Sequence, residues 1–194
     1  MCSSDLFLAG ASGVIGTRLL PLLHAAGHAV AAMTRTPAKT GILRSAGAEP
    51  VVCDVFDRPA LLATVAAFKP DVVMHQVTDL PDEAERIAEF RAANRRVRDE
   101  GTRNLIEAAR TAGATRLVAQ SVAWAIPGIE THEAAVVAAG GTVLRYGQFH
   151  GPGTYFETDP PPAPRVHIDE AARRTMDFLR GPAGVFTITD DANA

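Results

Sequence analysis

Short apolar runs alternate with longer amphipathic segments along the whole chain, and this alternation predicts the fold. Seven apolar runs are expected to be buried strands: residues 6–9, 29–33, 50–53, 71–76, 116–121, 142–146 and 185–189. Helical patterns fill the intervals at residues 14–26, 59–68, 81–112, 131–139 and 169–180. The sequence therefore predicts an α/β fold with a doubly wound parallel sheet of about seven strands, built as a single domain over residues 1–194.

Residues with special backbone preferences mark the expected helix ends. Three glycines follow helical patterns where a left-handed cap is expected: Gly27, Gly113 and Gly181. Pro59 and Pro81 stand where a first helical turn tolerates a missing N–H. Asp169 is expected to cap the last helix through its carboxylate.

Composition narrows the classes of partner. The 194 residues carry a net charge of −3, so there is no broad basic surface for nucleic acid or an anionic membrane. No apolar run approaches the roughly 20 residues that span a bilayer. Two cysteines, Cys2 and Cys53, are too few for a disulfide framework, which favours a reducing cytoplasm.

Six histidines raise the question of a metal site. His132 and Glu133 begin like a zinc-protease motif, but Val136 stands where the second histidine ligand would be needed. The cysteines do not have zinc-ligand spacing either. No metal site is predicted.

A glycine-rich loop between the first predicted strand and the first predicted helix carries the strongest chemical signal. Gly10 permits a tight turn, Gly13 removes a side chain that would block a ligand, and Gly16 lets helix and strand pack closely. The backbone N–H groups and positive end of the following helix suit a pyrophosphate. In this strand-to-helix context the loop predicts a dinucleotide site.

The residue after the second predicted strand bears on the choice of dinucleotide. An acidic residue there usually accepts a hydrogen bond from the ribose 2′-hydroxyl of NAD. This chain has Arg35 instead, with Lys39 nearby, and an arginine suits a 2′-phosphate. NADP is therefore the expected cofactor, with NAD as the alternative.

The glycine spacing at 10, 13 and 16 resembles that of the short-chain dehydrogenase/reductase superfamily, in its extended or atypical NAD(P)-dependent epimerase/dehydratase branch. Residues 54–55, 71–76, 101–109, 144–153 and 166–172 agree with further segments of that family. The resemblance implies a Rossmann fold and a set of cofactor contacts. The expected cofactor contacts include the glycine loop and Arg35. The full set is Gly10, Ser12, Gly13, Val14, Ile15, Gly16, Arg35, Asp54, Val55, His75, Gln76, Val77, Ser121, Gln148 and Phe149.

The family's catalytic tyrosine, four residues before a lysine, has no counterpart here. The tyrosines are Tyr146 and Tyr155, and no lysine follows Lys69. The catalytic residues are therefore unknown, with Ser121 and Tyr146 as candidates. A sharper hypothesis has Tyr146 or His150 supplying a proton, and the alternative, which we favour, has these residues only holding the cofactor or the loop backbone.

The substrate side is expected to be reduced, with residues 154–194 comprising a vestigial substrate-side segment and the last helix and strand. A homo-oligomer and a small-molecule substrate are expected. Two functions stay open. One is an NAD(P)-dependent oxidoreductase or sugar epimerase-like enzyme with a non-standard acid/base set. The other is a non-catalytic NADP(H)-binding redox sensor or regulatory subunit.

Overall fold

The computed structural model, described here for residues 4–190, contains the predicted parallel sheet. The strand order is β3-β2-β1-β4-β5-β6-β9, and every pair is parallel. The strands are β1 (Asp5–Ala9), β2 (Ala29–Thr34), β3 (Glu49–Val52), β4 (Val72–His75), β5 (Arg116–Val122), β6 (Thr142–Tyr146) and β9 (Gly184–Ile188). Each corresponds to a strand predicted from the hydrophobic pattern, and the doubly wound α/β fold is confirmed.

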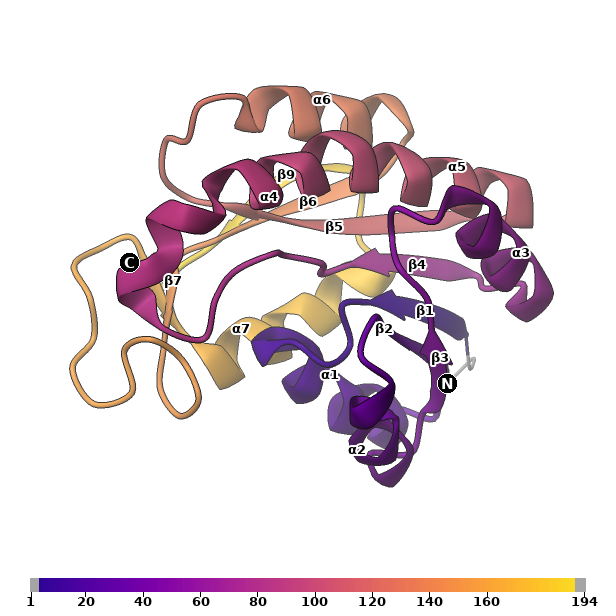
Figure 1. The fold of residues 1–194 in the computed structure, drawn as a ribbon, viewed down its shortest axis with the longest axis horizontal. Coiled ribbons are helices and arrows are strands. Elements are labelled where there is room, and N and C mark those ends of the chain that lie inside the picture. Colours follow the sequence, from indigo (N-terminus) through magenta and orange to yellow (C-terminus); the bar gives the residue numbers. More distant parts are fainter. Residues whose placement is uncertain (1–3, 191–194) are drawn as a thin grey trace.

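Helices cover both faces of the sheet (Figure 1). One face carries α1 (Val14–Ala25), α2 (Thr40–Ser45) and α7 (Ile168–Thr175), and the other carries α3 (Arg58–Phe68), α5 (Thr102–Ala112) and α6 (Ile129–Ala138). In β1, Leu6 and Leu8 pack into the first core, whereas Phe7 and Ala9 pack into the second. This alternation explains why β1 is apolar from Leu6 to Ala9: both of its faces are buried there.

The predicted helix over residues 81–112 is present from residue 91 onward, interrupted by a π-helical turn, and the prediction is wrong for residues 81–90. A 3₁₀ segment η2 (Ala84–Phe90), a short helix α4 (Arg91–Arg96) and a π-helical turn η3 (Val97–Gly101) precede α5. Pro81 lies before this segment and begins no helix. Gly101 packs tightly where η3 meets α5, because a Cβ there would lie 3.3 Å from the Val55 methyl groups. The π turn changes the helical phase at this contact, which hydrophobic periodicity does not encode.

Some predicted helix ends are confirmed and others are wrong. Gly27 and Gly113 have φ values of +81° and +77°, as expected of left-handed caps, whereas Gly181 does not adopt that conformation. Pro59 lies in the first turn of α3. Asp169 does not cap α7, because the ring of His167 accepts the Asp169 N–H at 3.3 Å and serves as the cap.

The last predicted helix, residues 169–180, is divided between α7 and the 3₁₀ turn η4 (Met176–Leu179). The hydrophobic pattern gave no sign of four further elements. These are the 3₁₀ turn η1 (Pro37–Lys39), helix α2, and the strands β7 (Gln148–His150) and β8 (Arg165–His167), which form a two-stranded parallel sheet. Each element is too short to leave a clear periodic signal. Residues 151–164, between β7 and β8, form no helix or strand.

Two sequence expectations can be compared with residues 4–190. Within that range no helix is both long and apolar enough to cross a membrane. Cys53 is buried and its thiol is free, whereas Cys2 lies outside the described residues.

Candidate functional site

The strand order reverses between β1 and β4, and sheets of this kind bind ligands beyond the carboxyl ends of the strands at that reversal. Two glycines bring the chain together there. Gly10 has a φ of +86°, and a Cβ at this position would lie 2.5 Å from the carbonyl oxygen of Gln76. A Cβ at Gly16 would lie 2.7 Å from the carbonyl oxygen of Ala11. The two glycines thus allow the loop to press on the end of β4 and the helix to press on the loop.

Gly13 is less crowded than Gly10 and Gly16. It is the N-cap of α1, and beyond its chain neighbours a Cβ would meet only the Gly10 carbonyl oxygen within 4 Å, at 3.3 Å. The preceding side chain, Ser12, is turned aside, because its hydroxyl is hydrogen-bonded to that of Thr34 at 2.9 Å. The first N–H groups of a helix have no partner within it and carry partial positive charge. Gly13 therefore leaves a path by which an anion can approach these groups.

Val14 and Ile15 form the start of that helix. Ile15 is 6% exposed and belongs to the hydrophobic core, and Val14 packs against the same core. Any contact that Ile15 makes with a ligand is therefore through its backbone, whereas the Val14 side chain is only partly buried.

Gln76 leaves a buried polar atom without a partner at the same edge. The residue is 4% exposed, and its Oε1 has no hydrogen-bond partner among the described residues. Its Nε2 lies 3.5 Å from the Tyr146 hydroxyl, and its backbone N–H donates to the Ala9 carbonyl. An unsatisfied buried acceptor costs on the order of 1–3 kcal/mol. A hydroxyl or amide donor of a nicotinamide nucleotide would relieve that cost, so the residues present fit such a group.

The predicted adenine contacts, Asp54 and Val55, follow β3. The Asp54 side chain accepts the N–H of Phe56 at 2.9 Å, which shapes the turn and leaves the residue exposed. Val55 is 4% exposed, and its carbonyl accepts a hydrogen bond from the buried Asn104 amide at 2.9 Å. Val55 thus forms an apolar floor held in place from α5.

Arg35 extends from the end of β2, and its guanidinium is already paired. Arg35 Nη2 donates to Asp79 Oδ1 at 2.7 Å, with the two side chains 58% and 15% exposed, respectively. The hydrogen bond to Asp79 raises the pKa of Arg35. The N–H of Asp79 donates to the Asn94 side chain at 3.2 Å. Sequence reasoning missed Asp79, because it lies in an irregular segment with no periodic signal.

Comparisons with known proteins agree with this geometry. A family model described as "NAD dependent epimerase/dehydratase family" matches residues 6–165. The chain belongs to this family. It is 34% identical to a Streptomyces protein described as a 3-diazoavenalumate denitrifying reductase, covering 96% of the chain and 76% of that protein. The alignment spans 235 residues, more than the chain contains, so the relative has internal segments that this chain lacks.

Solved structures of similar fold include sugar-nucleotide epimerases. A Thermus thermophilus UDP-glucose 4-epimerase in complex with NAD has a TM-score of 0.79 at 18% identity, covering 95% of this chain and 77% of the epimerase. The Bordetella bronchiseptica enzyme WbmG in complex with NAD has a TM-score of 0.75 at 17% identity, covering 97% and 73%. These structures support the fold of this member of the epimerase/dehydratase family.

Both tyrosines of this family member direct their hydroxyl groups to protein acceptors. Thr175 donates to the Ala171 carbonyl, so the Tyr146 hydroxyl donates to Thr175 Oγ1, at 2.7 Å. Burial raises the pKa of Tyr146 to about 12. The Tyr155 hydroxyl donates to the Pro81 carbonyl, and burial raises its pKa as well. Neither phenol is arranged as an acid poised near neutral pH.

The candidate Ser121 is also engaged. Its hydroxyl donates to Glu133 Oε1 at 2.6 Å, and the same oxygen accepts Arg145 Nε at 2.8 Å. Arg145 Nη2 contacts the other carboxylate oxygen, and the Glu133 side chain is only 6% exposed. Arg145 holds the pKa of Glu133 below its usual range. Glu133 thus fixes the ends of β5 and β6 together, a role that its place in the sequence did not reveal.

His75 belongs to a buried chain of hydrogen bonds with a single direction. Its Nδ1 accepts the Val77 N–H at 3.2 Å, so Nε2 carries the proton and donates to Thr102 Oγ1 at 3.1 Å. Thr102 donates onward to His132 Nδ1, and His132 Nε2 donates to the Gln120 carbonyl at 2.9 Å. Burial lowers the pKa of His75 to about 3 and also lowers that of His132. Both rings are therefore neutral and serve to join β4, α5 and α6.

The predicted residues of β7 lie beyond the end of β6. The Gln148 side chain is 3.5 Å from the Pro162 carbonyl, and the Phe149 ring packs 5.3 Å from that of Tyr146. His150 Nε2 pairs with Asp190 at 2.8 Å. These contacts tie residues 148–150 to the loop that follows and to the end of β9.

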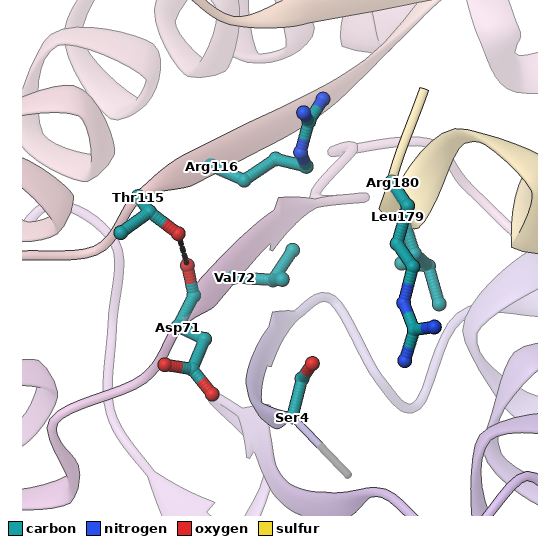
Figure 2. Close-up of a pocket in the computed structure, with 7 residues that line it drawn as sticks. All are labelled: Ser4, Asp71, Val72, Thr115, Arg116, Leu179 and Arg180. Atoms are coloured by element: carbon teal, nitrogen blue, oxygen red, sulfur yellow. Dashed lines mark hydrogen bonds between the residues drawn. The ribbon is translucent and has the colours of Figure 1, made fainter. Parts of the chain in front are cut away.

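A separate pocket of about 370 Å³ lies at the amino edge of the sheet, opposite the glycine loop (Figure 2). Asp71 and Arg116 line it at the starts of β4 and β5, and the Thr115 hydroxyl donates to the Asp71 carbonyl. Because this pocket lies at the opposite edge of the sheet, it is not part of the candidate dinucleotide site. Within residues 4–190 no group of three or more His, Cys, Asp or Glu side chains could hold a metal ion.

Proposed function

We propose that this protein is an NADP(H)-dependent reductase that delivers hydride to a small-molecule electrophile. The open approach at Gly13 and the unpartnered Gln76 Oε1 support a nicotinamide nucleotide at the carboxyl edge. The reductase in the name of the Streptomyces relative supports reduction as the reaction. When bound, the reduced nicotinamide supplies the hydride. The protein's residues bind and orient the nucleotide.

One observation separates this proposal from epimerisation. The hydroxyl protons of Tyr146, Tyr155 and Ser121 all go to protein acceptors, and no lysine follows Lys69. Sugar epimerisation and carbonyl reduction both require a proton to move at the reacting oxygen. A site with these residues suits a substrate that accepts hydride without protonation.

A diazo compound in its cationic diazonium form has this property. Hydride adds to the carbon that carries the nitrogen, a C–H bond forms, the C–N bond breaks with its electron pair leaving on nitrogen, and dinitrogen departs as a neutral molecule. The positive charge of the diazonium and the negative charge of the hydride cancel, so no acid is needed. The diazo compound in the name of the relative makes this class the first to test.

Arg35 carries the proposed preference for NADP(H) over NAD(H). A guanidinium binds phosphate oxygens through two parallel N–H donors. Arg35 follows β2 and Lys39 lies in η1, and these two basic residues support a preference for the 2′-phosphate. Substituting Arg35→Ala is expected to weaken NADPH binding about tenfold or more and to leave NADH binding unchanged. Binding of NADH that exceeds NADPH and survives this change would contradict the preference.

Fluorescence of Trp124, which is 38% exposed just after β5, provides the binding test. We expect NADPH to change the emission in the native protein and to have no effect in the Gly13→Val variant. Turnover is then measured with NADPH and 3-diazoavenalumate, counting NADPH consumed against dinitrogen released. UDP-glucose with NAD is the matched epimerase assay. Epimerisation of UDP-glucose would contradict the proposal, and NADPH binding without turnover of any electrophile would favour a redox sensor.

The proposal includes a homo-oligomer in the cytoplasm. A second copy would shield the substrate side, where residues 151–164 have no helix or strand of their own. Light scattering across a concentration series tests this part, and a monomer at all concentrations would contradict it.

A further inference from the structure

The ion pair of Arg35 and Asp79 crosses the opening in which the glycine loop lies. In the sheet, β1 lies between β2 and β4. Arg35 follows β2 and Asp79 comes shortly after β4, yet the two side chains meet at 2.7 Å. The contact therefore passes over the carboxyl end of β1, from which Gly10 and Gly13 lead into α1.

The pair places an acidic group where the expected cofactor phosphate would bind. Asp79 holds the Arg35 guanidinium, and the carboxylate of Asp54 is near enough to interact with the same charge. An arriving 2′-phosphate is a second anion for this guanidinium. Two anions on one cation repel each other, so phosphate and Asp79 compete.

We propose that Asp79 limits the preference for NADP(H) by occupying Arg35 in the free protein and yielding it to the 2′-phosphate when NADP(H) binds. Binding exchanges one ion pair for another. NAD(H), which has a hydroxyl at that position, leaves the pair intact. This inference rests on the proposed preference for NADP(H), and adds that the preference is reduced by a competitor within the chain.

The surroundings of Asp79 make the exchange feasible. Its side chain is 15% exposed, but its backbone N–H is held by Asn94 at 3.2 Å, so the main chain stays anchored when the carboxylate turns away. Arg35 is 58% exposed and has a long flexible side chain that can turn toward a ligand. A phosphate dianion offers stronger charge-assisted hydrogen bonds than one carboxylate oxygen does.

The test is the Asp79→Asn substitution, read by the dissociation constants of NADPH and NADH from Trp124 fluorescence or calorimetry. Exposed ion pairs typically contribute a factor of about two to five, so the NADPH constant is expected to fall by roughly that factor, whereas the NADH constant stays the same. In an Arg35→Ala background the effect of Asp79→Asn should vanish. Asp82→Asn is the matched control, because Asp82 is exposed nearby and makes no ion pair among the described residues.

A second measurement needs no cofactor. Amide hydrogen exchange of residues 77–83 should quicken in both Asp79→Asn and Arg35→Ala, and stay unchanged in Asp82→Asn. Unchanged or weaker NADPH binding in Asp79→Asn would overturn the inference. If Arg35→Ala still weakens NADPH binding in that case, the NADP(H) preference stands without the competitor. Failure of the native protein to bind either nucleotide would instead overturn the proposed function.

Discussion

Thr102 donates its hydroxyl proton to His132 Nδ1 across 2.8 Å while it accepts the Nε2 proton of His75 at 3.1 Å. One hydroxyl thus joins two buried histidines whose tautomers are set by the Val77 N–H and the Gln120 carbonyl. This chain of hydrogen bonds starts at the backbone N–H of Val77, beyond β4, and ends at the backbone carbonyl of Gln120 in β5. Every ring nitrogen of the two histidines therefore has a partner.

Stability is expected to fall as the pH drops below about 6.5. The pKa of His75 is about 3 in the folded protein, below its ordinary value of 6.5, so the unfolded chain binds a proton in this range and the folded chain does not. The stability that the folded protein gains from a neutral His75 is fully present above pH 6.5 and is lost progressively as the pH falls toward 3. Each pH unit below 6.5 should cost about 1.4 kcal/mol from His75, and His132 adds to it.

Urea unfolding at pH 7.5, 6.5 and 5.5, chosen to stay above the ordinary carboxylate range, measures this slope. A His75→Gln variant should have a shallower pH dependence than the native protein between those values. Equal stability at pH 7.5 and 5.5 in the native protein would contradict the assigned neutral histidines.

The substitution Thr102→Val should destabilise the fold without touching the cofactor loop. It leaves His75 Nε2–H and His132 Nδ1 without their shared partner in a buried place. Each unsatisfied group costs about 1–3 kcal/mol, so a loss of roughly 2–5 kcal/mol is expected. Chemical denaturation measures it. Thr102→Ser, which keeps the hydroxyl, is the control and should recover most of the loss.

Gly13 and Gly10 should respond differently to a side chain. A Cβ at Gly13 would meet only the Gly10 carbonyl oxygen, at 3.3 Å, so Gly13→Ala requires only a small shift: the melting temperature should stay within a few degrees of the native value while nucleotide binding weakens strongly. Gly10→Ala must meet the Gln76 carbonyl at 2.5 Å with a φ of +86°, so the fold itself should lose stability. Thermal melts and NADPH titrations on both variants separate the two effects, and equal melting temperatures would contradict the distinction.

Tyr146→Phe should leave turnover unchanged. The Tyr146 hydroxyl donates to Thr175, and its raised pKa of about 12 keeps it protonated at neutral pH. Its removal deletes the hydrogen bond to Thr175 and the longer one from Gln76 Nε2, at a cost of about 1–3 kcal/mol in stability. A fall in kcat of tenfold or more, with the fold intact, would restore Tyr146 as a proton donor. The same kinetics on His150→Ala test the other residue of that hypothesis.

The sequence was sufficient for elements whose burial is continuous. β1, β4 and β5 are apolar on both faces, and Gly10 and Gly16 are needed by close backbone contacts, so pattern and chemistry agree there. The sequence was insufficient where contacts between residues far apart in the chain determine the partner of a side chain. Asp79 meets Arg35 from 44 residues away, and Ser121 turns from an expected cofactor contact to Glu133 on α6. Neither partner has a local signature.

The edges of the sheet differ in what they offer another strand. Pro50 lies within the edge strand β3, paired with Ala32 of β2, and has no N–H to offer outward. The opposite edge strand, β9, has no proline between Gly184 and Ile188, and Val185 there is 41% exposed. The missing N–H of Pro50 therefore hinders the pairing of a further strand with β3, and β9 has no such feature. We expect edge-to-edge association of partly unfolded molecules to proceed through β9.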